Sequence, residues 1–200
     1  MLQGKSCNDA LQLTPLDPRI VGGTAVEEVW SEPKRIVASG KKSSRLKAVE
    51  TRDIAAALTA LIADFFALYL KTKNFRWHVS GSHFRDYHLL LDEQSAEILA
   101  AVEPMAARVR KLGATTLRSV GHVARLQRLL DNDQHYLEPR QMITELLDDN
   151  RQIVDLLREA YELCNDNGDF VSLNLISDCT DDAEGRAWVL LSIMQDENGE

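Results

Sequence analysis

The strongest constraint on the fold is a helical spacing of apolar residues that runs from Asp53 to about Met194. Glycine and proline, which interrupt helices, are scarce here: only six glycines and two prolines follow residue 52. No segment shows a convincing strand pattern. The sequence therefore predicts an all-α domain over residues 53–196, preceded by a different kind of segment over residues 1–52.

Breaks in the pattern divide this domain into four long helices. The first is expected over 53–77, and HVSGSH (78–83) separates it from a second that ends at Gly113, a natural residue after a helix C-terminus. The third begins at Glu138-Pro139, and Asp169 can cap a fourth that runs to about Met194. The long connection over 114–137, with a short helix in SVGHVARLQRLL, lets the second and third helices run parallel. Four-helix bundles with one crossover, including ferritin-like folds, have this connectivity.

Composition supports a soluble domain. The apolar run over 54–70 is interrupted by Thr59 and Asp64, which favours a buried helix over a membrane span. The three cysteines are widely spaced and odd in number, as in reduced cytoplasmic proteins. We therefore expect a cytoplasmic protein.

Residues 1–52 carry the opposite charge to the rest of the chain. They contain nine Lys and Arg against six Asp and Glu, although the whole chain has a net charge of −8. Three prolines and a Gly-Gly pair predict an extended, largely irregular arm. The candidate DNA-binding residues are Lys34, Arg35, Lys41, Lys42, Arg45, Lys47 and Arg52. A basic arm on an acidic body is compatible with non-specific DNA binding and equally with a solvated tail.

His88, Asp92 and Glu103 form a polar line on the expected second helix. His88 and Asp92 are one turn apart, and Glu103 returns to within about 20° of Asp92. An imidazole and two carboxylates are suitable ligands for iron. Asp92 and Glu103 are about 16 Å apart along the axis, so one ion could bind both only if a second copy ran antiparallel across a two-fold axis. Periodicity alone also permits a solvated helix face.

The run KTKNFRWHVSGSHFRDYHLLLDEQ (71–94), followed by RVRKLG (108–113), resembles the signature of the Dps family, the DNA-binding proteins from starved cells. The matching positions are Trp77, Gly81, Phe84, His88, Asp92, Leu112 and Gly113. The resemblance implies a ferritin-like shell of twelve subunits, a miniferritin. Such shells oxidise iron(II) with peroxide or oxygen at sites shared by two subunits, store ferric mineral and protect DNA. It assigns His88 and Asp92 as ligands from one subunit and Glu103 as a ligand from its partner, with Trp77 close by.

Two ligand positions depart from the family pattern. Arg76 stands where a histidine is usual, and Ala107 stands where a glutamate is usual. Arginine remains protonated and cannot bind a metal, but it can pair with Asp92 or with Glu103 of a partner. Pro104 should also bend or unwind the turn beside Glu103.

The sequence thus leaves two functions open. One is an iron-oxidising and iron-storing shell, in which His78 or His83 could replace the lost histidine. The other is the same shell with an impaired oxidation site, acting through DNA association at the nucleoid or through passive iron storage. Asp166 and Asp169 could line a pore of the shell or form a solvated turn.

Overall fold

The structure, a computed structural model, describes residues 48–196. Its helices are α1 (Ala48–His78), α2 (Phe84–Ala100), α3 (Val102–Lys111), α4 (Val120–Leu126), α5 (Pro139–Asp166) and α6 (Phe170–Asp196). No strand occurs within these residues. Arg52 lies in α1, whereas the other six candidate DNA-binding residues lie outside the described part of the chain.

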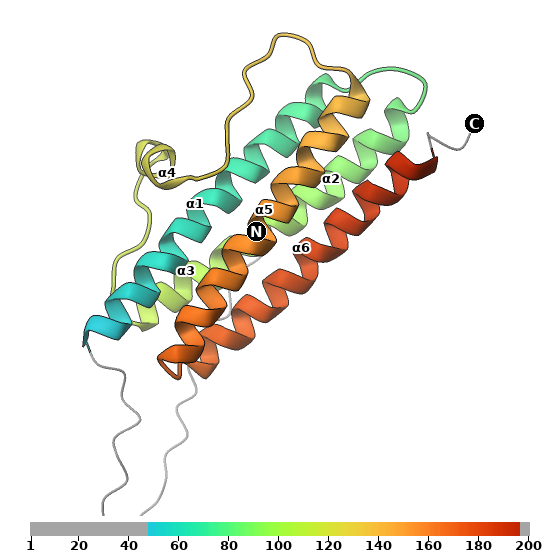
Figure 1. Cartoon of the computed structure of the whole chain (residues 1–200). Helices are drawn as coiled ribbons and strands as arrows, with labels where there is room; N and C mark the ends of the chain where they lie inside the picture. The colour runs from blue at the N-terminus through green and yellow to red at the C-terminus, as the bar shows by residue number, and fades with distance from the viewer. Residues whose placement is uncertain (1–47, 197–200) are drawn as a thin grey trace, which may run out of the picture. The chain divides into compact units, whose positions relative to one another are not determined.

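Four helical rods run side by side: α1, α2 continued by α3, α5, and α6 (Figure 1). α1 packs against α2, α3 and α5, and α5 packs against α6. Residues 112–138 carry α4 along the outside of the bundle, from the end of α3 to the start of α5 (Figure 1). α2 and α5 therefore run parallel. This confirms the expected four-helix bundle with one long crossover and a short helix inside it.

α1 is the core helix of the bundle. By length and composition alone it could cross a membrane. Many of its large apolar side chains, however, are fully buried against the other helices, among them Leu58, Phe65 and Leu68. Burying one such side chain contributes about 1.5–3 kcal/mol. α1 begins at Ala48, five residues before the expected start, because AVETR continues the helix into the segment assigned to the arm.

Two helix ends follow from the local sequence. Glu138 and Gln141 form a reciprocal capping box, and Pro139 occupies the first position of α5, where no N–H is needed. At the end of α3, Gly113 adopts a φ of 86°. The backbone N–H of Ala114 donates to the carbonyl of Val109 and that of Gly113 to Arg110, which closes the helix.

The expected single helix from Ser82 or His83 to Gly113 is wrong. α2 begins at Phe84, a one-residue turn interrupts it at Ala101, and α3 continues the rod from Val102. Pro104 explains the interruption, because it has no N–H to donate to the carbonyl of Ala100. Restarting the helix places Pro104 in a first turn, where backbone N–H groups need no helical partner. The bending or local unwinding expected beside Glu103 thus takes the form of this one-residue interruption.

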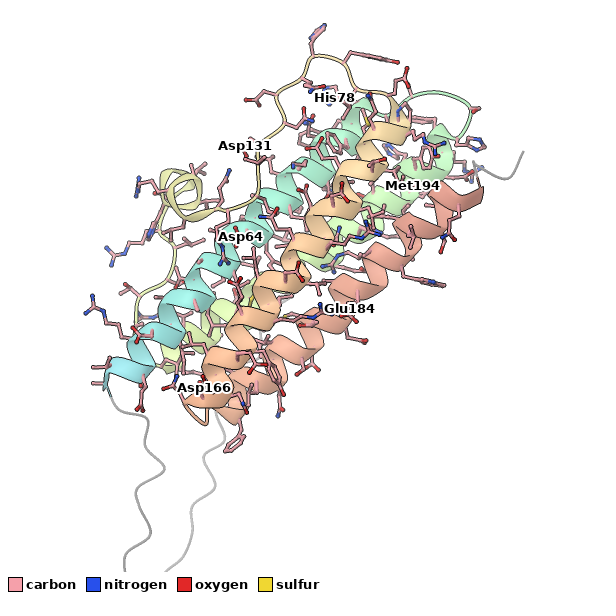
Figure 2. All side chains as sticks on the ribbon, in the orientation of Figure 1. Asp64, His78, Asp131, Asp166, Glu184 and Met194 are labelled. Atoms are coloured by element: carbon pink, nitrogen blue, oxygen red, sulfur yellow. The ribbon has the colours of Figure 1, made fainter. Side chains whose placement is uncertain are left out.

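Asp64 holds the long connection against α1 through hydrogen bonds. It is fully buried on α1, about midway along the bundle (Figure 2). Its carboxylate accepts hydrogen bonds from the backbone N–H of Arg128 and from Nε and Nη2 of the same residue, the latter two at 3.0 and 2.7 Å. One buried acid thus satisfies three donors and fixes the path of the chain beyond α4.

Replacing Asp64 by Ala should therefore destabilise the bundle by about 2–4 kcal/mol, because charged donors lose their acceptor. Urea unfolding measures this, with Asp133→Ala, an exposed acid of the same connection, as the control. Equal losses of unfolding free energy in the two variants would contradict the role of Asp64 in holding the connection.

Candidate metal centre

The residues expected to bind iron lie on two consecutive helices. His88 and Asp92 are one turn apart on α2, and Glu103 is the second residue of α3. His88 is partly buried, the Asp92 side chain is 48% exposed, and Glu103 is exposed. The interruption at Ala101 thus divides the predicted polar line, with His88 and Asp92 before it and Glu103 after it.

Asp92 is occupied by two cations from α1. Lys73 Nζ donates a hydrogen bond to Asp92 Oδ1 over 2.8 Å, and Arg76 Nε lies 2.9 Å from the same oxygen. The Arg76 Nε–H is not aligned with this oxygen, so that contact is ionic rather than a directed hydrogen bond. The expected pair between Arg76 and Asp92 is present, and Lys73 joins it.

These cations keep Asp92 ionised. The hydrogen bond from Lys73 lowers the pKa of Asp92 below its ordinary value; partial desolvation opposes this shift, and the charge of Arg76 adds to it. The carboxylate is therefore already compensated by charges of its own chain.

His88 keeps a geometry that suits a ligand. Its Nδ1 donates to the backbone carbonyl of Arg76 over 3.2 Å. A neutral imidazole with a protonated Nδ1 has its free lone pair on Nε2, the usual state of a metal-binding histidine. The backbone of Arg76 thus orients the one intact histidine, while its side chain occupies the neighbouring acid.

Within a single chain, the described residues do not assemble a complete donor set for iron(II). Within residues 48–196, no three His, Cys, Asp or Glu side chains converge on a possible metal site. If a second copy added Glu103, the two carboxylates would face two cations, and the shared site would have no net negative charge. A histidine at position 76 and a glutamate at position 107 would give the same site a charge of −2. An excess of negative charge favours the binding of a divalent cation.

Within a single chain, the remaining candidates do not complete the site. His78 Nδ1 donates to the carbonyl of Asn74, and His83 precedes the first residue of α2; neither joins a cluster with His88 and Asp92. Trp77, expected close to the ligands, is 61% exposed on the single chain. Ala107 is partly buried on α3 and contributes no donor.

The turn between α5 and α6 corrects another expectation. Asp169 is buried and caps α6 by accepting from the backbone N–H of Ser172, as predicted, and it also pairs with Arg108 of α3. Its carboxylate is therefore not available to line a pore. Asp166 is exposed at this end of the bundle, opposite the end that carries His78 (Figure 2).

Sequence reasoning missed two lysines of α1. Lys73 is one turn before Arg76, and this spacing could have placed it beside Asp92. Lys71 is buried and bridges Glu145 and Asp149 of α5 at 2.8 and 2.7 Å. Burial raises the pKa of Asp149, although Lys71 opposes the shift. This second cluster ties α1 to α5, and its lysine fills the place between the two acids.

Comparison with known proteins identifies the family. A model of the ferritin-like domain matches residues 55–198. The chain belongs to the ferritin-like family. The DNA protection during starvation protein 1 of Deinococcus radiodurans is 28% identical over 152 residues, which cover 76% of this chain and 73% of that protein.

Solved structures agree with this ferritin-like assignment. Antigen TpF1 from Treponema pallidum aligns with a TM-score of 0.73 at 22% identity, covering 77% of this chain and 99% of its own. The Dps protein from Vibrio cholerae O1 is described as a member of a broad superfamily of ferritin-like diiron-carboxylate proteins. It aligns with a TM-score of 0.72 at 21% identity and covers 78% of this chain and 98% of its own. The Dps resemblance expected from the sequence is confirmed.

The pair between Lys73 and Asp92 predicts a pH-dependent mutational effect. Because Lys73 lowers the pKa of folded Asp92, the pair stabilises the fold above the ordinary aspartate pKa of about 3.9, and this stabilisation is lost as pH falls through the lowered pKa. Replacing Lys73 by Gln should therefore destabilise the protein at pH 7 and progressively less below about pH 4. Urea unfolding across this range measures the difference, with Lys111→Gln as the control. A pH-independent effect would contradict the pair.

Proposed function

We propose that this chain is the subunit of a Dps-like miniferritin shell, a homo-oligomer of twelve copies in the family pattern, that stores iron and protects DNA. We propose further that the oxidation centre shared by two subunits is impaired. The observation that carries this second point is the occupation of Asp92 by Lys73 and Arg76. The names of the relatives support the first: one is a DNA protection protein and another belongs to the diiron-carboxylate proteins.

In such a centre, iron(II) is the substrate. Two iron(II) ions each give one electron to hydrogen peroxide, which takes up two protons and leaves as two water molecules. The protein must hold the ions with a donor set of net negative charge. Here His88 and Asp92 would have to bind iron against the repulsion of two cations, and Ala107 offers nothing in return. Slow oxidation and passive storage follow from that charge balance.

A working oxidation centre is the second candidate. It is favoured by the orientation of His88, whose Nδ1 contact leaves Nε2 free. In this case Lys73 and Arg76 would move aside when iron(II) arrives, and His88, Asp92 and Glu103 of the partner would bind it. The two candidates predict different rates for the same unmodified protein.

Ferric absorbance after anaerobic addition of iron(II) and peroxide separates the candidates. We expect the wild-type shell to oxidise iron(II) little faster than buffer alone. The double variant Arg76→His, Ala107→Glu should be faster by at least about tenfold, because it restores two ligands and removes one cation. Ala107→Gln, which adds length without charge, is the matched control. A wild-type rate far above buffer would overturn the impaired site, and an inactive double variant would refute its explanation.

We assign DNA protection to two features of the shell: the basic arm, which binds DNA, and the storage of iron. The described body is acidic and should repel DNA, whereas Lys34, Arg35, Lys41, Lys42, Arg45 and Lys47 can neutralise phosphates without reading sequence. Twelve arms on one shell would multiply a weak affinity. A cytoplasmic particle associated with the nucleoid is the setting that this arrangement suits.

Deleting residues 1–47, which leaves α1 intact, should abolish DNA retention in gel-shift assays at low salt, because the acidic body remains. Wild-type binding should weaken steeply as salt rises. Replacing Lys41, Lys42, Arg45 and Lys47 by Gln keeps the length of the arm and should weaken binding in the same direction. Undiminished retention by the deleted chain would refute the role of the arm.

A further inference from the structure

Arg76 has donors that the chain does not use. Its Nε lies against Asp92, but within residues 48–196 no acceptor is paired with its two terminal nitrogens. The Arg76 side chain is 23% exposed. A guanidinium presents several N–H donors in a planar fork that matches a carboxylate. The arginine can therefore bind its own Asp92 and a second acid at the same time.

Glu103 is an acid without a partner in the described part of the chain. It is exposed, and no ion pair or hydrogen bond involves its side chain there. The interruption at Ala101 places it at the second position of α3, near a helix N-terminus that favours a negative charge. Glu103 is thus exposed outside the bundle core, but it is too far along the rod to reach its own Arg76.

An exposed seam connects the two charges. Leu89, Asp92, Ala96, Leu99 and Glu103 follow one another at spacings of three and four residues, the pattern of a helix that packs against another helix. Leu89 is 51% exposed and Leu99 is 39% exposed. A two-fold axis midway between Asp92 and Glu103 would set Leu99 of each copy against Ala96 of the other. A large residue would then face a small one, and Glu103 would lie beside Asp92 of the other copy.

We infer that Arg76 forms an ion pair with Glu103 of a second copy of this chain. This ion pair, the intersubunit clasp, occupies the position where the sequence predicts a metal site. The inference rests on the two-fold arrangement of the proposed shell. Lys73 and Arg76 balance Asp92 and the partner's Glu103, which leaves the shared site neutral without a metal. The clasp occurs twice in each two-fold dimer, once on each side of the axis.

Charge exchange tests the clasp without iron. The fraction of assembled protein is measured by sedimentation against protein and salt concentration for wild type, Glu103→Arg, Arg76→Glu and the double exchange. Either single reversal should weaken assembly by about tenfold or more, because like charges meet across the axis. The double exchange should recover to within about threefold of wild type. Glu162→Arg, which reverses an exposed acid of α5, is the control and should not change assembly.

Each outcome decides the matter. Rescue by the double exchange supports the clasp, and circular dichroism verifies that every variant is folded. Single reversals that assemble like wild type, or a double exchange no better than the sum of its parts, overturn it. A wild-type chain that sediments as a monomer overturns the clasp and the shell together. If these results overturn the clasp while the wild-type protein still stores iron and retains DNA, the proposed function stands.

Discussion

The contact between α1 and α2 around Asp92 is the interaction on which the functional account depends. Three groups of α1 meet this part of α2: the Lys73 ammonium, the Arg76 guanidinium and the Arg76 carbonyl. The carbonyl prepares His88 as a ligand, while the two cations neutralise the neighbouring acid. One short stretch of α1 therefore both orients the His88 imidazole and neutralises the Asp92 carboxylate, the two groups of α2 expected to bind iron.

Much of the architecture could be predicted from local sequence. Gly113 and Glu138-Pro139 have fixed roles at helix ends, and each is found in the role assigned to it. The interruption beside Glu103 was also accessible, since Pro104 lacks the donor that a continuous helix needs. What local sequence did not provide was the choice between bending and breaking. The chain breaks at Ala101, which puts Pro104 in a first turn.

The contacts between distant segments could not be read in the same way. Asp64 and Arg128 are separated by 64 residues, and only the packed connection brings them together. Asp169 illustrates the same limit: its capping role follows from its neighbours, but its pairing with Arg108 of α3 depends on tertiary packing. KTKNFR contains three basic residues, and the sequence did not show that Lys73 contacts Asp92, although Lys73 is one helical turn from Arg76. For the metal centre, the ligand types were visible in the sequence, and the identity of their charged neighbours required the fold.

A crystal structure of the assembled protein soaked with iron(II), with anomalous data at the iron edge, tests the central claim most directly. The account predicts no iron peak between His88 and Asp92, with the guanidinium of Arg76 and the ammonium of Lys73 still beside the Asp92 carboxylate. An iron ion coordinated by His88 Nε2 and Asp92, with both cations displaced, would contradict it.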